Sequence, residues 1–358
     1  MTASKVILAR TRRAVRQQSA AIAVVLLAVL AGLLPATAAR AQEPSTAVIL
    51  MYHRFGDESV ASANIRIEQF EAHLNELAAG GYTVLPLADI VASLKSDTPL
   101  PDQSVAITID TAHVSVFEEA WPRLRATGYP FTVFVASDLV DAGRRDVMTW
   151  TQLRTLQKDG ATIAALGASY TNLAMRPPEK VAADILRSKR RISDEIGATP
   201  PFFAYPFGVY DGVIKGLVRD AGFDAAFGQH SGAAHALDDM FSLPRFSLTE
   251  AYGSLERFRL VARTLPLPVT NLTPALPVLT ERNPPNIGFT LSERIGPVKT
   301  ITCFASGQGK VSVERLPAGR VEVRLPGPFA HGRARLNCTA VEGERWRWFG
   351  RQFYVPRS

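Results

Sequence analysis

The sequence predicts an α/β fold, a distorted barrel built from seven strand and helix units and followed by a small all-β, sandwich-like domain. From Val48 to about Phe246, short apolar runs alternate with amphipathic helical stretches, a pattern typical of parallel sheets and barrels. A proline-rich segment follows at residues 265–283. From Asn286 onward the pattern contains only strands, separated by glycine and proline, which indicates a change of architecture within the chain.

Seven apolar runs of strand length define the predicted barrel, residues 42–264. They are Val48–His53, Thr83–Leu87, Val105–Asp110, Phe131–Ala136, Ala161–Leu166, Phe202–Phe207 and Ala225–Gly228. Helix start and stop signals lie between them, since Thr149 and Gln152 form a capping-box pattern, and Pro178 and Gly197 bracket another helix. Strands that alternate with helices at this spacing favour a barrel over a sandwich.

The proline-rich segment 265–283 is predicted to be a linker, because its prolines disfavour both a helix and a central strand. Residues 284–358 then form a small antiparallel β domain. Its predicted strands are Ile287–Leu291, Thr300–Phe304, Val311–Arg315, Arg320–Leu325, Arg333–Val341 and Trp346–Val355. Trp346 and Trp348 share one face of the last strand, and we expect them to fill the core of this domain in preference to binding a sugar.

The two cysteines of the chain, Cys303 and Cys338, both fall in this β domain. In an oxidising compartment such a pair is expected to form a disulfide, which stabilises by roughly 3–4 kcal/mol for a loop of this size. Two free buried thiols are the alternative. The spacing does not match a metal-binding cysteine motif.

Residues 1–41 have the pattern of a secretory signal peptide. They hold basic residues but no acidic one, and the apolar run Ala20–Leu34 is shorter than the roughly 20 residues that a membrane span needs. Ala39-Arg40-Ala41 offers a cleavage site before Gln42. We therefore expect an exported protein, periplasmic or secreted, without a stable membrane span after cleavage. An uncleaved anchor or an ordinary buried helix is the alternative.

Most of the formal net charge of +7 comes from this leader. Residues 42–264 hold 21 basic and 27 acidic residues, whereas the chain from Leu265 onward holds 13 basic and 6 acidic residues. The two halves therefore have opposite charge. The total does not support a nucleic-acid partner.

Asp110 ends the predicted strand Val105–Asp110, in which Thr108 and Asp110 point to one side and Ile107 and Ile109 to the other. In a barrel, Asp110 then faces inward at the carboxyl end of its strand, where barrel enzymes place catalytic groups. A carboxylate that caps the helix starting near Ser115 is the alternative.

Five segments, in order along the chain, resemble the motifs of the NodB-homology polysaccharide deacetylases of carbohydrate esterase family 4 type. They are Met51–Phe55, Thr108–Ala112, Gly160–Ile163, Phe202–Asp211 and Leu243–Arg245. The resemblance implies a metal-dependent hydrolase of non-peptide carbon–nitrogen bonds that removes N-acetyl groups from glycans. Matched residue by residue, it makes Asp110 the general base and His53 the general acid.

The resemblance also implies three substrate-binding residues. Tyr205 and Phe207 belong to the segment that shapes the acetyl pocket and offers a backbone N–H to the oxyanion. Arg245 is placed to pair with Asp110 and keep it ionised, in place of the arginine that the family has at the position of Ala204. The alternatives are core aromatic residues for Tyr205 and Phe207, a surface ion pair for Arg245, and a hydrogen-bonded barrel histidine for His53.

The metal ligands of the family are replaced in this chain. Thr111 takes the place of the second aspartate, and Leu166 and Tyr170 take the places of the two histidines. Leucine has no donor atom, and protonated hydroxyls are poor ligands, so a standard zinc site cannot form. We expect no cofactor unless zinc or another divalent metal binds a rebuilt site. The candidates for such a site are Asp110, His53, His113 and His230.

Two functions are compatible with these features. We favour a non-catalytic pseudoenzyme that binds N-acetylated polysaccharide or oligosaccharide of the envelope or the extracellular space. The alternative is an active deacetylase with a non-standard site, in which Asp110 and His53 keep their roles as base and acid.

Overall fold

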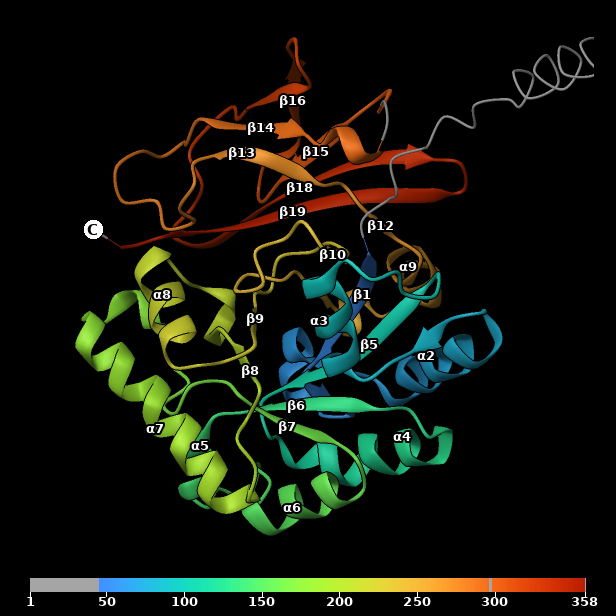
Figure 1. Ribbon diagram of the computed structural model, residues 1–358, viewed down its shortest axis with the longest axis vertical. Coiled ribbons are helices and arrows are strands. Elements are labelled where there is room, and N and C mark those ends of the chain that lie inside the picture. The colour runs from blue at the N-terminus through green and yellow to red at the C-terminus, as the bar shows by residue number, and fades with distance from the viewer. Residues whose placement is uncertain (1–44, 296–297, 358) are drawn as a thin grey trace, which may run out of the picture. The chain divides into compact units, whose positions relative to one another are not determined.

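The computed structural model describes residues 45–295 and 298–357, so the predicted signal peptide lies outside the described residues. The first part of the chain folds into a curled, mostly parallel sheet, drawn in blue to yellow in Figure 1. Its strand order is β10, β1, β5, β6, β7, β8, β9, with β11 and β4 beside β1 and β5. These strands are β1 (Thr46–Tyr52), β4 (Thr83–Val84), β5 (Ser104–Asp110), β6 (Phe131–Val135), β7 (Thr162–Ala165), β8 (Phe202–Ala204), β9 (Ala225–Phe227), β10 (Ala234–His235) and β11 (Phe246–Ser247).

Helices follow most of these strands, and most of them lie along the outer side of the sheet, whereas α3 packs on the inner apolar cluster (Figure 1). They are α2 (Ile67–Ala79), α3 (Leu87–Ser96), α4 (Trp121–Thr127), α5 (Ser137–Asp141), α6 (Trp150–Lys158), α7 (Pro178–Ile196), α8 (Gly212–Asp220) and α9 (Leu255–Ala262). The predicted capping box is present, because Thr149 Oγ1 accepts from Gln152 N and Gln152 Oε1 accepts from Thr149 N. No helix among residues 45–295 and 298–357 is long and apolar enough to cross a membrane.

Shorter elements complete this part of the chain. A two-stranded ladder joins β2 (Arg54–Phe55) to β3 (Asn64–Ile65), and a π-helical turn at Val116–Ala120 leads into α4. Single 3-10 turns occupy Glu58–Ala63, Leu173–Met175, Pro206–Gly208, Glu250–Tyr252 and Glu293–Ile295.

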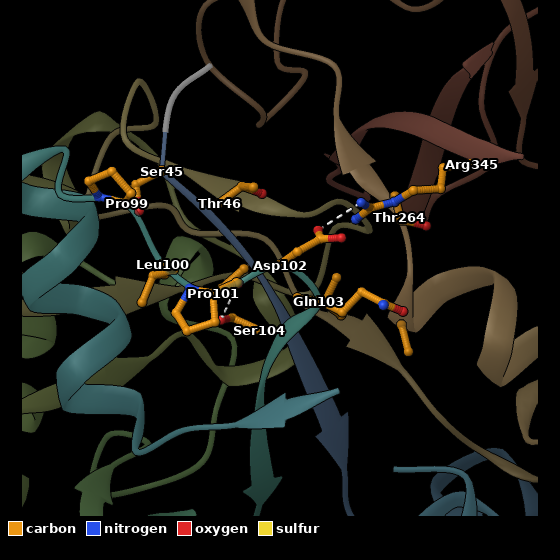
Figure 2. Close-up of a pocket in the computed structure, with 13 residues that line it drawn as sticks. Ser45, Thr46, Pro99, Leu100, Pro101, Asp102, Gln103, Ser104, Thr264 and Arg345 are labelled. Carbon is orange, nitrogen blue, oxygen red and sulfur yellow. Dashed lines mark hydrogen bonds and ion pairs between the residues drawn. The ribbon is translucent and has the colours of Figure 1, made fainter. Parts of the chain in front are cut away.

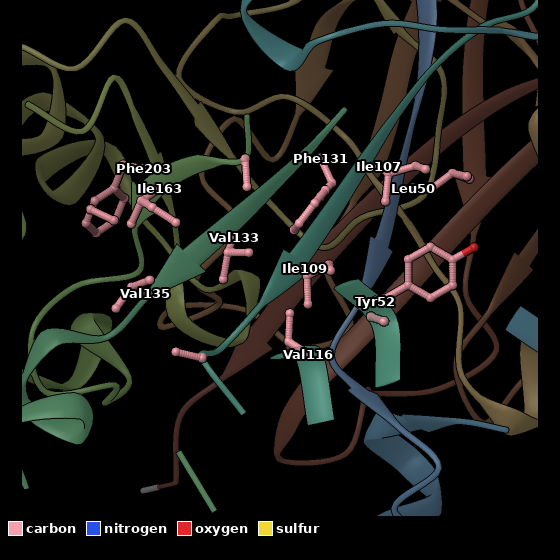
Figure 3. Packing of buried hydrophobic residues seen from close by; sticks show 14 of the residues in the cluster. Leu50, Tyr52, Ile107, Ile109, Val116, Phe131, Val133, Val135, Ile163 and Phe203 are labelled. Carbon is pink, nitrogen blue, oxygen red and sulfur yellow. The ribbon is translucent and has the colours of Figure 1, made fainter. Parts of the chain in front are cut away.

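The strands of the curled sheet separate an outer apolar layer from an inner layer that contains Asp110. Figure 3 shows Leu50, Ile107, Ile109 and Val133 in the outer layer, which packs against the helices. The alternating residues face inward, among them Thr108 and Asp110, which are fully buried. The predicted inward orientation of Asp110 is therefore confirmed, and it follows from the two-residue period of the strand.

The two ends of the curled sheet are joined by the segment between Leu243 and Ser247. Leu243 bridges Phe227 of β9, and Phe246 of β11 pairs with Leu50 of β1. The fold class predicted from the sequence is confirmed, and all seven predicted strands belong to the curled sheet, which also contains the two-residue strands β10 and β11. The predicted strand Thr83–Leu87 is only the short β4, because Pro86 ends it and Leu87 already begins α3.

The second sheet, called the β domain here, has the strand order β12, β19, β18, β15, β16, β17, β14, β13. In Figure 1, β13, β14 and β16 form a layer over β18 and β19. The strands are β12 (Leu265–Pro266), β13 (Val269–Thr273), β14 (Ile287–Leu291), β15 (Thr302–Ala305), β16 (Gly309–Arg315), β17 (Arg320–Arg324), β18 (Gly332–Glu342) and β19 (Arg345–Val355). The predicted linker therefore contains β12 and β13, both at edges of the sheet, where a missing proline N–H costs little. The domain boundaries proposed from the sequence stay predictions.

The core of the β domain holds the predicted disulfide but not the tryptophans. Cys303 and Cys338 are direct cross-strand neighbours and are bonded, with an S–S distance of 2.01 Å. Trp346 is 38% exposed, and Trp348 packs its ring edge-to-face on Phe246, with 5.3 Å between the ring centroids. The prediction that these tryptophans fill the core was wrong, because the alternate residues of β19, such as Phe353, face that core.

The barrel and the β domain belong to one compact unit, and several contacts join them. Gln352 Nε2 donates to the carbonyl oxygen of Phe207 over 2.9 Å, and Arg345 Nη1 lies 2.7 Å from Asp102 Oδ1. Gly350 lies directly against Ser231, since an added Cβ would fall 2.1 Å from the Ser231 carbonyl oxygen. The contact through Arg345 and Asp102 joins the basic β domain to the acidic barrel.

Candidate functional site

Asp110 and Arg245 form a buried ion pair at the carboxyl ends of the barrel strands. Arg245 Nη1 lies 2.6 Å from Asp110 Oδ1, and Nη2 lies 2.8 Å from Oδ2, so the pair is bidentate. Both side chains are 0% exposed. The expectation that Arg245 pairs with Asp110 is confirmed. The alternative of a surface ion pair is wrong, because both side chains are buried, and Asp110 bonds to Arg245 and does not cap a helix.

The surroundings of Arg245 satisfy the rest of its guanidinium group. Its Nε donates to the Gly228 carbonyl oxygen over 3.0 Å, and Nη1 also donates to Thr108 Oγ1 over 3.2 Å. The guanidinium carbon lies 5.1 Å from the centre of the Phe134 ring. Each of the three guanidinium nitrogens therefore has a hydrogen-bond partner, and a charge paired and bonded in this way is the form in which ions are tolerated in a protein interior.

Gln229 connects this ion pair to the β domain. Its Nε2 donates to Asp110 Oδ2 over 3.3 Å, and its Oε1 accepts from Arg333 Nη1 of β18 over 3.2 Å. The sequence analysis did not identify Gln229 or Arg333. The signal that could have found Arg333 is the alternation of Arg333 and Arg335 with Ala334 and Leu336, which places two arginines on the face of β18 opposite its core.

Two adjacent cavities open beside the ion pair. The first, the upper site cavity, has a volume of about 260 Å³ and is lined by His53, Arg54, Thr111, His113, Asp146 and Tyr170, among others. The second, the lower site cavity, has a volume of about 280 Å³ and is lined by His53, Tyr170, Phe207, Gln229, Tyr252, Arg333 and Arg335, among others. His53 and Tyr170 line both cavities, whereas Asp110 and Arg245 line neither.

His53, the candidate general acid, is half-buried between the two cavities. Burial is the main influence on it and lowers the pKa of its imidazole, while the charge of Asp110 acts in the opposite direction. Its Nδ1 is buried and has no hydrogen-bond partner within the described part of the chain. No described residue therefore fixes its tautomer, whereas a catalytic histidine is normally oriented by a bond to its second nitrogen.

Tyr170, Phe207 and Thr111 form the wall between the ion pair and the cavities. The rings of Tyr170 and Phe207 are in contact, with 4.8 Å between their centroids. Burial raises the pKa of Tyr170 to about 12, so its hydroxyl stays protonated and can donate a hydrogen bond to a ligand. All three residues have left-handed backbone conformations, with φ of 69° at Thr111, 50° at Tyr170 and 59° at Phe207.

The remaining predicted substrate-binding residue, Tyr205, lies in the core. Its ring is fully buried and stacks on Tyr210, with centroids 4.6 Å apart. Its hydroxyl donates to the Phe241 carbonyl oxygen over 2.8 Å. Of the three residues expected to bind substrate, the structure therefore brings only Phe207 to a cavity, because Tyr205 and Arg245 are both enclosed.

The residues that the sequence analysis assigned to the family's metal positions do not fit a metal ion. Leu166 is fully buried in the inner apolar cluster, and Tyr170 keeps its proton. Within residues 45–295 and 298–357, no group of three His, Cys, Asp or Glu side chains could hold a metal. His113 Nδ1 is bonded to Ser115 Oγ over 2.8 Å, and burial lowers the pKa of His230 to about 4. The expectation that no metal binds stays a prediction.

A further cavity lies at the opposite ends of the strands, away from these residues. Figure 2 shows its lining, which includes Thr46 at the start of β1, Ser104 at the start of β5, and the ion pair between Asp102 and Arg345. Its volume is about 200 Å³. The amino-terminal face of a barrel usually contributes to stability, so we do not assign the site there.

Three comparisons relate the chain to known proteins. The family model for polysaccharide deacetylase matches residues 97–226. YxkH of Bacillus subtilis (strain 168) carries the name of a polysaccharide deacetylase. It is 24% identical to this chain over 209 residues, which cover 58% of this chain and 72% of YxkH. The poly-beta-1,6-N-acetyl-D-glucosamine N-deacetylase of Escherichia coli (strain K12) is 22% identical over 243 residues, which cover 55% of this chain but only 36% of that protein.

Solved structures agree with this relationship at the level of the fold. The Streptococcus pyogenes deacetylase PplD, solved with acetate, has a TM-score of 0.57 at 20% identity and covers 61% of this chain and 99% of its own. IcaB from Ammonifex degensii has a TM-score of 0.53 at 21% identity, and the match covers 62% of this chain and 98% of IcaB. With the curled sheet, the ordered motifs and the matched segment at residues 97–226 together, the barrel part of this chain belongs to the polysaccharide deacetylase family.

Proposed function

We propose that this protein binds N-acetylated glycans of the cell envelope or the extracellular space and does not deacetylate them. The residues Thr111, Leu166 and Tyr170 at the predicted metal positions carry this proposal, and the enclosure of Asp110 supports it. A general base must reach the proton that it abstracts, directly or through one water. Both oxygens of Asp110 are held by Arg245, and the carboxylate lines neither site cavity.

The metal positions support the same conclusion. Without a metal the attacking water keeps a pKa near its bulk value, and the developing oxyanion lacks its strongest stabilising charge. Thr111, Leu166 and Tyr170 offer no substitute for the missing ligands.

The site cavities keep features that suit a neutral sugar. Phe207 and Tyr170 offer aromatic faces, and Tyr170 and His53 offer polar groups at the boundary between the two cavities. The E. coli relative is named for poly-beta-1,6-N-acetyl-D-glucosamine, so oligomers of this polymer are the first ligands to test. Export by the predicted signal peptide would bring the protein to such polymers.

Calorimetric titration with β-1,6-linked N-acetylglucosamine oligomers, run beside an acetate-release assay, tests this proposal. We expect binding without acetate release. Tyr170→Ala should weaken the binding by about tenfold, since it removes a ring contact and a donor. Tyr129→Phe is the control, because Tyr129 precedes β6 at the opposite end of the strands. Turnover of about one per second or faster by the unmodified protein would overturn the proposal.

Restoring the family's ligands tests the reason for the missing activity. The triple exchange Thr111→Asp, Leu166→His and Tyr170→His should allow zinc binding, detected by metal analysis, and slow acetate release. The rate should stay low, because absent outer bonds to new ligands typically cost about 10–100-fold. A triple variant that binds no zinc would show that the barrel has changed more than its ligands.

A further inference from the structure

The lower site cavity continues into a third cavity between the barrel and the β domain. This third cavity has a volume of about 350 Å³ and shares Ser247, Tyr252 and Arg335 with the lower site cavity. We call the two together the junction groove. Its far part is lined by Ser231, Arg257, Phe304, Ser306, Asn337 and Trp348, among others.

The ionisable side chains that line the junction groove include three arginines and His53, whose pKa is lowered by burial. Arg257, Arg333 and Arg335 line it, and no aspartate or glutamate does. Within the described residues none of these three arginines forms an ion pair, and Arg257 Nε is buried without a hydrogen-bond partner. Burial, and then the charge of Arg333, lower the pKa of Arg335. An anion in the groove would relieve this repulsion.

Aromatic rings lie beside these arginines. Tyr252 is 48% exposed and Phe304 is 46% exposed, and both line the groove. The Arg257 guanidinium lies 5.0 Å from the centre of the Tyr252 ring and 6.0 Å from that of Trp348. Rings of this kind stack on sugars, and the planar fork of arginine matches a carboxylate with two parallel bonds.

We propose that the junction groove binds acidic oligosaccharides, with sugar carboxylates paired to Arg257 and Arg335 and sugar rings packed on Tyr252 and Phe304. This inference rests on the proposed function, because it makes the groove the extension of the same glycan site. Continuity with the site cavities favours a glycan over a single-stranded nucleic acid, which has a similar need for arginines and rings.

Titration of the full exported chain with a galacturonate trimer tests the inference. We expect the galacturonate trimer to bind more tightly than the uncharged N-acetylglucosamine trimer. Raising the salt concentration should weaken the binding of galacturonate but not that of N-acetylglucosamine. Arg335→Gln and Arg257→Gln should each weaken galacturonate binding by about tenfold or more. Arg257→Gln should also change N-acetylglucosamine binding little, because Arg257 lines only the far part of the groove and not the lower site cavity. Arg335→Lys keeps the positive charge but loses the planar guanidinium. Its affinity for galacturonate should therefore lie between those of the unmodified protein and Arg335→Gln.

Arg324→Gln is the matched control, because it removes the same charge from an exposed position on β17 that faces Glu314 and Glu322. Equal effects of Arg324→Gln and Arg335→Gln would overturn the inference. So would equal affinity for inorganic phosphate, or tighter binding of a single-stranded oligonucleotide. Binding of the N-acetylglucosamine trimer alone would overturn the inference and leave the proposed function standing, whereas binding of galacturonate alone would do the reverse.

Discussion

Exchanging Arg245 for methionine is expected to lower the free energy of unfolding by about 3–5 kcal/mol, the range seen when one partner of a buried ion pair is removed. The geometry supports the upper part of this range. The exchange removes two charged bonds of 2.6 and 2.8 Å between groups that are both 0% exposed. Asp110 would then keep only the weaker bond from Gln229, at 3.3 Å.

A double-mutant cycle separates the pair from the rest of the arginine's contacts. Asp110→Asn should also destabilise, and the double variant should cost less than the sum of the two single variants, with a coupling energy of about 2–3 kcal/mol. Urea unfolding followed by circular dichroism gives the free energies, and an unchanged slope confirms that the unfolded states are comparable.

Arg191→Met is the surface control for this cycle. Arg191 and Asp141 form an ion pair of 2.9 Å, but their side chains are 37% and 36% exposed. Such a pair is expected to contribute less than about 1 kcal/mol. If Asp110→Asn instead leaves stability unchanged or raises it, the carboxylate is not a structural group, and the argument that it is unavailable as a base fails.

Three further predictions concern the metal, the disulfide and the acid stability. Protein purified from its native compartment should contain no stoichiometric zinc, cobalt or nickel by metal analysis, and a full equivalent would contradict this. Mass spectrometry without reduction should find no alkylatable thiol, and replacing both cysteines by alanine should cost about 3–4 kcal/mol in urea unfolding. Burial lowers the pKa of His73 to about 4, below its unfolded value, so stability should fall as the pH drops from about 6.5 through 4. His73→Gln should lessen that fall by up to roughly 3 kcal/mol, and an unchanged acid limb would refute its cause.

The sequence predicted much of the fold because its strands alternate clearly. Ile287–Leu291 has the predicted bounds, and the orientation of Asp110 followed from the same alternation. The strands β10 and β11 were not predicted because each has only two residues, too few to show a period. Trp346 and Trp348 were predicted to face the core of the β domain, but they lie on the opposite face of β19, where Trp348 contacts Phe246 of the barrel. The local sequence pattern does not show that the barrel covers that face.

The candidate site was predictable only in part, for a similar reason. Asp110, His53, Phe207 and the partner Arg245 came from segments that lie in or beside the barrel. Gln229 and Arg333 meet across the contact between the barrel and the β domain, and residue spacing along the chain does not encode such a contact. Their role depends on how the two sheets pack.

Backbone conformation at the site supports a role in binding. Thr111, Tyr170 and Phe207 all have positive φ, and a side chain in this region typically costs about 1–3 kcal/mol, which persists only where the surroundings enforce it. Thr111 and Tyr170 are two of the positions at which the sequence predicts the family's metal ligands to be replaced, and all three residues line the site cavities. Cavity walls whose shape is fixed by the backbone suit the proposed binding role, since contacts to sugar rings and hydroxyls depend on shape and need no metal.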